Sequence, residues 1–304
     1  MNINEAIQQF RDYMIVQKGF SPKTITAYSS DLTRFADYLA NRDNLSLVEN
    51  IKTQDIVSYL SFLTYPDKNK KPILVVSRAR KIASIKSFFN FLRKRKIIEI
   101  SPAEDVSIPK LPQQEPSYLT INEYQKLLTV IAETASPFFK LRDLAIMSLF
   151  ISTGIRVSEL VNLKIKDVDF DYQTIKVKRK GNKQQTIPLN DDMAELLHQY
   201  LNVRPETEKD NLFISKKGNG VRANTVYCLV KKYLDLAGLD KNKKGPHLLR
   251  HSCLTALLSK GVDLPTIQAI AGHRSIQTTT KYLHIQSKQI REAVSKIDLR
   301  KEKI

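Results

Sequence analysis

The sequence predicts a mainly α-helical protein built from two domains, of which the second carries a small antiparallel β-sheet. Three observations lead to this fold class. The chain has 304 residues, which is more than one ordinary core organises. Apolar residues recur at helical spacing along most of it, while a short region around residues 174–189 alternates as strands do. Three prolines within residues 109–116 mark a linker between a first domain, residues 1–108, and a second, residues 117–304.

The first domain is expected to be a bundle of four helices. The first helix is predicted by apolar residues at helical spacing over residues 3–14. Ser21 and Pro22 mark the start of the second, because a capping hydroxyl precedes a proline whose missing amide proton costs nothing there. A third helix is expected over residues 53–63, and a fourth has its apolar stripe over residues 82–92.

The second domain is expected to mix helices with one hairpin. A capping box of Thr120 and Glu123 starts its first helix. A nearly continuous apolar helix over residues 141–151 is expected at the centre of the core. Gly181 and Asn182 predict the turn of the hairpin. The other expected elements are strands at 174–178 and 186–189 and helices near 191–201, 223–236, 246–260 and 263–271.

The charge of the chain indicates a polyanionic partner. The formal net charge is +18 and the pI is about 9.7, and nucleic acid is the commonest partner of so basic a protein. Both predicted domains carry more Lys and Arg than Asp and Glu, so we expect the partner to contact both, as in a two-lobed clamp. The helix around residues 82–92 fits phosphate contact and plain solvation equally well; its cations are Arg78, Arg80, Lys81, Lys86, Arg93 and Arg95.

Three features predict a cytoplasmic protein. No apolar run approaches the roughly 18 residues of a membrane span. The first ten residues lack the basic and apolar segments of a secretory signal. Cys228 and Cys253 form no CxxC pair, and we expect both to be small core residues in a reducing compartment.

One segment of the second domain joins a guanidinium to two imidazoles. His247, Arg250 and His251 would share one face of a helix. Arg binds phosphate in a bidentate way, and His moves protons near neutral pH. A zinc site is the weaker interpretation, because the zinc motif needs Glu where this chain has Leu248. Incidental histidines at the start of a helix remain an alternative.

Two further cations could join this group. Arg156 comes shortly after Gly154, where the apolar helix is expected to end. It either points into a cleft or pairs with Glu159 at the surface. Lys180 lies among four cations at the tip of the predicted hairpin. It is either solvated or, as a compact donor with an adjustable pKa, suited to general-acid work.

Tyr282 is the candidate nucleophile. It lies nine residues after His273, which follows a helix-ending glycine. An isolated tyrosine is normally a packing residue. A phenol with a pKa near 10 is also a poor nucleophile, unless cations lower its pKa or a base removes its proton. Arg156, Arg250 and nearby imidazoles could do both.

Taken in order, these segments resemble the tyrosine recombinase, or phage integrase, family. The resemblance rests on TGIRVSEL, KGNK, HLLRHS and AGHRSIQTTTKY in the second domain. In the first domain, SPKTITAYSSDLTRFADYL and RKIASIKSFFNFLRKR are similar to the SAM-like core-binding domain of Xer-type members. Ala271 departs from the family pattern, which usually has Leu there, and we expect it to affect packing only.

The resemblance implies a metal-free and cofactor-free site of six residues: Arg156, Lys180, His247, Arg250, His273 and Tyr282. Tyr282 would attack the scissile phosphate while Arg156 and Arg250 hold it. Lys180 would protonate the leaving 5′ oxygen, His247 would assist proton transfer at the nucleophile, and His273 would donate to a non-bridging oxygen. Glu159 and His251 would support the two arginines.

The implied function is site-specific recombination of double-stranded DNA through a 3′-phosphotyrosyl intermediate. It would serve chromosome-dimer resolution or the integration and excision of a mobile element. Four protomers of this chain, or of it and a related recombinase, would act on two DNA sites, with the last helix docked in a neighbouring protomer. A type IB topoisomerase and a non-catalytic DNA-binding regulator are the alternatives.

Overall fold

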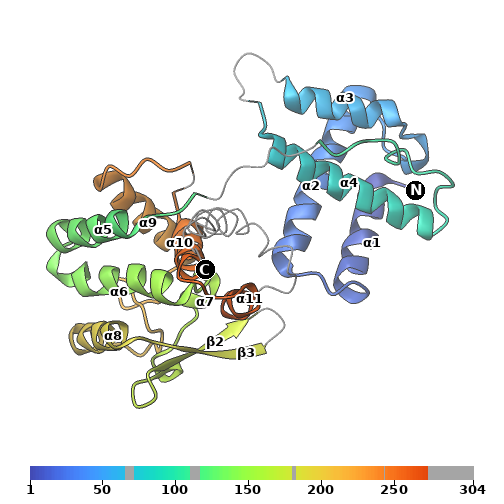
Figure 1. Ribbon diagram of the computed structural model, residues 1–304. Coiled ribbons are helices and arrows are strands. Elements are labelled where there is room, and N and C mark those ends of the chain that lie inside the picture. The colour runs from blue at the N-terminus through green and yellow to red at the C-terminus, as the bar shows by residue number, and fades with distance from the viewer. Residues whose placement is uncertain (66–71, 110–116, 180–182, 243, 273–304) are drawn as a thin grey trace, which may run out of the picture. The chain divides into compact units, whose positions relative to one another are not determined.

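The computed structural model describes residues 1–65, 72–109, 117–179, 183–242 and 244–272. It divides into two compact units, Met1–Gln113 and Gln114–Ile304, and each is described by itself (Figure 1). The predicted linker, from residue 110 onward, lies outside the described residues, as do Lys180, His273, Tyr282 and the last helix. Within the described ranges, no helix is long and apolar enough to cross a membrane.

The first unit is the predicted bundle of four helices: α1 (Ile3–Val16), α2 (Pro22–Asp43), α3 (Thr53–Thr64) and α4 (Val75–Lys94). A 3-10 turn, Val48–Asn50, precedes α3. The hydroxyl of Ser21 accepts the amide of Thr24 at 3.3 Å, with proline in the first turn of α2, as the sequence predicts. Phe10, Phe35 and Phe89 fill the core between the helices.

The cations of α4 are tied into this unit. Lys81 is 4% exposed, and its ammonium donates to Asp31 on α2 at 2.9 Å. Arg80 donates to the other oxygen of the same carboxylate. Lys86 donates to the carbonyls of Glu104 and Val106 at 3.0 and 2.8 Å. The expectation of a solvated or phosphate-binding face is therefore wrong for Lys81, whose ammonium pairs with Asp31 and so holds α4 to α2.

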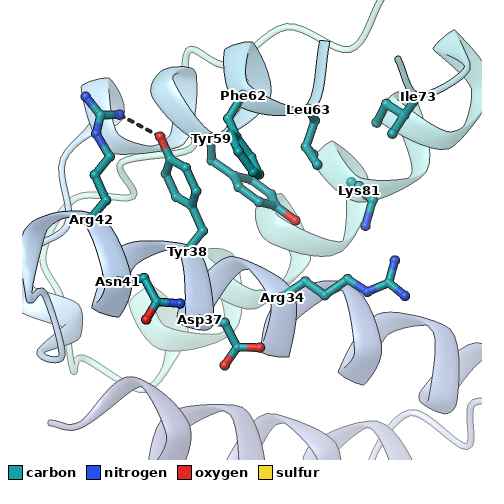
Figure 2. Close-up of a pocket in the computed structure, with 10 residues that line it drawn as sticks. All are labelled: Arg34, Asp37, Tyr38, Asn41, Arg42, Tyr59, Phe62, Leu63, Ile73 and Lys81. Carbon is teal, nitrogen blue, oxygen red and sulfur yellow. Dashed lines mark hydrogen bonds between the residues drawn. The ribbon is translucent and has the colours of Figure 1, made fainter. Parts of the chain in front are cut away.

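A cavity of about 670 Å³ lies in the first unit and is lined by residues of α2, α3 and α4 together with Ile73. Figure 2 shows the ring of Tyr59 in it, with the hydroxyl directed toward the end where Arg34 and Lys81 lie. Tyr59 is 1% exposed, and no described residue hydrogen-bonds its hydroxyl. Burial raises the pKa of this phenol to about 12.

The second unit contains helices and one small antiparallel sheet, as predicted. Its strands run antiparallel in the order β1-β2-β3, with Ile175 opposite Ile187 and Arg179 opposite Lys183. The elements are α5 (Ile121–Thr134), α6 (Pro137–Thr153), α7 (Val157–Leu160), a 3-10 turn (Ile165–Asp167), β1 (Val168–Asp169), β2 (Thr174–Arg179), β3 (Lys183–Pro188), α8 (Asp191–Val203), α9 (Ala223–Leu236), α10 (Pro246–Ser259) and α11 (Leu264–Ala271).

Helix α6 is the centre of this unit, as its apolar sequence predicts. It packs against α5, α8 and α10, and Ile146, Leu149 and Phe150 on it are fully buried. Arg142 and Asp143 pair with each other at 2.7 Å. Because Asp143 also accepts the hydroxyl of Tyr233 at 2.7 Å, this pair links α6 to α9.

The two cysteines differ from each other in exposure. Cys253 on α10 is buried, as expected of a small core residue, and burial raises its thiol pKa to about 12. Cys228 on α9 is exposed, so the same expectation is wrong for it. That expectation rested on the general tendency of free cysteine to be buried, whereas the buried residues of α9, Val226, Val230 and Tyr233, place Cys228 on the outer side of the helix.

Candidate active site

Arg156 stands at the start of α7, directly after the turn that ends α6. Gly154 terminates α6 in the left-handed conformation, at φ +61°. The carboxylate of Glu159 accepts the backbone amide of Arg156 at 2.9 Å and its Nη1 at 2.8 Å. The second guanidinium nitrogen, Nη2, donates to the carbonyl of Gly272 at 2.9 Å. Pairing with Glu159 and pointing inward are thus not alternatives, because Glu159 holds the guanidinium while its other nitrogen reaches α11.

Arg250 approaches the same place from α10. It is 5% exposed, and its Nη1 donates to the carbonyl of Gly154. Its Nη2 donates to the carbonyl of Ala271 at 2.6 Å. The peptide groups of Ala271 and Gly272 are consecutive, so Arg156 and Arg250 bring two guanidiniums to one point at the end of α11.

Arg179, at the end of β2, is a third guanidinium at this point. Its Nη1 donates to the carbonyl of Ala271 at 2.5 Å and its Nη2 to that of Ile270 at 2.7 Å. Burial lowers the pKa of Arg179; the Coulombic effect of Glu159 opposes the shift, and that of Arg156 adds to it. The sequence did not indicate Arg179 as a site residue, because it is one of four similar cations in the hairpin.

The end of α11 explains why three cations gather there. The last carbonyls of a helix have no partner within the helix and carry its partial negative charge. Gly272 follows α11 at φ +57°, and a Cβ built on it would lie 1.8 Å from Nη1 of Arg179. The backbone conformation therefore favours glycine, and a larger residue here would have to displace Arg179 from its present position.

His247 and His251 lie on α10 with Arg250, as the spacing predicts. His247 is exposed in the first turn, and His251 is half-buried one turn later. Leu248 and Leu249 are buried in the core and fix the rotation of the helix. Of the six predicted site residues, the described part of the chain therefore contains Arg156, His247 and Arg250.

The arrangement suits an anion with several acceptor oxygens. Guanidinium groups present planar forks of N–H donors that match phosphate oxygens, and they remain charged at any physiological pH. Arg156 keeps 30% of its side chain exposed, although it is held by Glu159. A phosphate that reached this side chain would meet a cation already fixed in orientation.

Two family models match the chain. Residues 117–289 match the phage integrase family, and residues 7–96 match the phage integrase N-terminal SAM-like domain. The chain belongs to the phage integrase family. Its two parts thus correspond to the two parts of an integrase, and the mainly helical fold with a small antiparallel sheet is confirmed.

Relatives of this integrase-family chain extend over nearly its whole length. It is 39% identical to the tyrosine recombinase XerC of Caldanaerobacter subterraneus subsp. tengcongensis, over 97% of this chain and 87% of that protein. It is 32% identical to the tyrosine recombinase XerD of Listeria innocua, over 95% of this chain and 97% of that protein. Among solved structures, the XerH site-specific recombinase bound to palindromic difH substrate, in a post-cleavage complex, superposes with a TM-score of 0.74. It is 27% identical, over 90% of this chain and 79% of that one. This integrase-family chain is a tyrosine recombinase, an enzyme of site-specific recombination.

Proposed function

We propose that this recombinase cuts and rejoins double-stranded DNA through Tyr282, which forms a 3′-phosphotyrosyl intermediate. The observation that carries the proposal is the meeting of Arg156 and Arg250 at two consecutive peptide groups, Ala271 and Gly272. From this point the chain continues toward His273 and Tyr282. A phosphate bound by the two arginines would therefore lie beside the start of the segment that carries the nucleophile.

Arg156 can bind such a phosphate without losing its present contacts. A guanidinium has five N–H donors, and the bonds to Glu159 and Gly272 use two of them. Arg250 is more deeply buried, so its charge acts through a low-dielectric surrounding. Together they would stabilise the charge of the pentacoordinate transition state, where preorganised donors have their largest effect.

In the proposed reaction, the phenol oxygen of Tyr282 bonds to phosphorus and the bond from phosphorus to the 5′ oxygen breaks. His247 assists removal of the phenol proton, and Lys180 supplies a proton to the leaving 5′ oxygen. His273 donates to a non-bridging oxygen. Glu159 holds Arg156, and His251 supports Arg250. Rejoining reverses these steps with a 5′ hydroxyl as the attacking group, so no ATP is consumed, and the two guanidiniums supply the charge that a metal would bring.

The proposed assembly has four protomers on two DNA sites, composed of this chain alone or with a related recombinase. The net charge of +18 and the XerH complex with difH support DNA as the partner. We propose that both domains contact the duplex in the manner of a clamp, in the cytoplasm. The cellular role would be chromosome-dimer resolution or the integration and excision of a mobile element.

The experiment that tests the proposal is covalent capture. The full chain is incubated with a random-sequence duplex library, denatured in detergent, and the DNA bound to protein is sequenced. Wild type and Tyr172→Phe, which alters an 81% exposed tyrosine of the same unit, should form adducts. Tyr282→Phe should bind the duplexes thus identified and form none. Adducts that persist in Tyr282→Phe would refute the proposal, and a wild type that binds but forms none would indicate a DNA-binding regulator.

A separate measurement distinguishes recombination from relaxation alone. A plasmid that carries two copies of the captured site should yield recombinant circles with wild type. A type IB topoisomerase would instead relax supercoiled plasmids that lack the site, and it would do so without producing recombinants.

A further inference from the structure

Arg179 is the residue that joins the hairpin to the end of α11. Both of its terminal nitrogens donate to carbonyls there, those of Ile270 and Ala271. From the opposite strand, Gln185 donates to the carbonyl of Ala269 at 3.1 Å. Figure 1 shows α11 beside β2 and β3. Three consecutive carbonyls of α11 are thus bound by side chains of one hairpin.

Several features of the surrounding structure hold the side chain of Arg179 in one place. Its side chain is half-buried, and the room for it exists because residue 272 has no Cβ. Its Nη1 shares the carbonyl of Ala271 with Nη2 of Arg250. A bidentate, charge-assisted grip fixes the direction of a helix end more tightly than a single neutral hydrogen bond.

We propose that Arg179 is a positioning residue for strand cleavage. It holds the end of α11 in place and thereby sets where the chain enters the segment of His273 and Tyr282. The inference rests on the proposed function, because it assumes that Tyr282 must reach the phosphate bound by Arg156 and Arg250. Both terminal nitrogens of Arg179 donate to peptide carbonyls, so the residue acts on the position of Tyr282 through the backbone of α11.

Three possible roles for Arg179 would have different effects on DNA binding and on the cleavage reaction. As a phosphate ligand, it would contribute to DNA affinity and to the salt dependence of binding. As a support for Lys180, its neighbour in sequence, it would affect protonation of the leaving oxygen. As a holder of α11, it would affect the attack of the phenol alone.

The test uses the full chain on a duplex obtained by covalent capture. Arg179→Gln removes the grip, and Arg179→Lys keeps the charge but offers one donor group in place of a fork. Lys176→Gln is the control, because it removes one cation from an exposed position of the same strand. The measurements are the single-turnover rate of adduct formation, DNA affinity at several salt concentrations, and the rate on a duplex with sulfur in place of the bridging 5′ oxygen.

A thiolate leaves without needing a proton, so the sulfur substrate should rescue Lys180→Ala but not Arg179→Gln. The cleavage rate of Arg179→Gln on the ordinary duplex should fall by up to about 100-fold, the cost of a misplacement near 1 Å. Its DNA affinity and salt dependence should match those of wild type. Arg179→Lys should recover part of the rate, and Lys176→Gln should behave as wild type.

Four results would overturn the inference. They are an unchanged rate in Arg179→Gln, rescue by the sulfur substrate, a salt slope that falls by about one as for a lost phosphate contact, and a loss of folding in both Arg179 variants. A failure of the proposed function is recognised separately, because it would leave adducts in Tyr282→Phe whatever Arg179 does.

Discussion

Glu159 binds Arg156 twice, through the backbone amide at 2.9 Å and through Nη1 at 2.8 Å. The same carboxylate thus caps α7 and orients the guanidinium that we propose as a phosphate ligand. Because one carboxylate has both roles, a change at residue 159 should affect the free energy of unfolding and the cleavage rate together.

Glu159→Gln tests this coupling. The amide has one acceptor oxygen in place of two and turns N–H donors toward a cation. We expect a loss of about 1–3 kcal/mol in the free energy of unfolding and a fall in cleavage rate of about 10- to 100-fold. The measurements are urea unfolding of the full chain and the rate of adduct formation.

The matched control is Glu123→Gln, which alters the capping box of α5. Glu123 accepts the amide of Thr120 at 2.8 Å and also pairs with Lys241. Glu123→Gln should lower the free energy of unfolding and leave the cleavage rate of the folded protein unchanged. Equal cleavage losses in both variants would mean that Glu159 acts through stability alone.

Arg250→Lys should cost more in cleavage than in DNA binding. An ammonium on a shorter reach cannot donate both to Gly154 and to Ala271, as the buried guanidinium does. We expect the cleavage rate to fall by about 100-fold or more, the usual cost of one lost transition-state donor. Single-turnover adduct formation measures this, and an active Arg250→Lys would remove Arg250 from the proposed pair.

Local features of the fold were predictable from sequence. The start of α2 at Ser21 and the capping box at Thr120 depend on residues within one helical turn, so short motifs suffice to locate them. The hairpin strands were found from alternation, whereas β1, with two residues, is too short to give a periodic signal. Four motifs taken in order predicted the six site residues, and two of these, Arg156 and Arg250, meet at the end of α11.

Contacts between distant residues could not be found in this way. The pair of Lys81 with Asp31 and the grip of Arg179 on Ala271 join residues far apart in the chain. In sequence, Lys81 looks like a lysine that is either solvated or bound to phosphate, and Arg179 like one more cation of a basic turn. Only the packing of α4 on α2, and of α11 on the hairpin, gives these charges their separate roles.

Tyr233→Phe should destabilise the second unit. The hydroxyl of Tyr233 donates to the buried carboxylate of Asp143 at 2.7 Å. Removing the hydroxyl leaves one oxygen of the buried Asp143 carboxylate without that donor, and the loss of this hydrogen bond should cost about 1–3 kcal/mol. Urea unfolding measures the difference, and a variant as stable as wild type would show that the bond contributes nothing net.

Tyr59→Phe should behave in the opposite way. The hydroxyl of Tyr59 lies in the cavity of Figure 2 and has no hydrogen-bond partner among the described residues. Removing a buried, unsatisfied hydroxyl relieves a desolvation cost, so we expect the free energy of unfolding to be unchanged or to rise by about 1 kcal/mol. A clear loss of stability in Tyr59→Phe would reveal a partner for this hydroxyl.

Asp31→Asn should be strongly destabilising, because Asp31 compensates the buried charge of Lys81 and also binds Arg80. Leaving one member of a buried pair uncompensated costs about 3–5 kcal/mol. Asp37→Asn, on an exposed position of the same helix, should change the unfolding free energy by less than about 0.5 kcal/mol. If the cost comes from the stranded ammonium, adding Lys81→Met to Asp31→Asn should restore much of the stability. If the double variant is no more stable than Asp31→Asn, the cost comes instead from the hydrogen bonds that Asp31 loses with other residues of α4, such as Arg80.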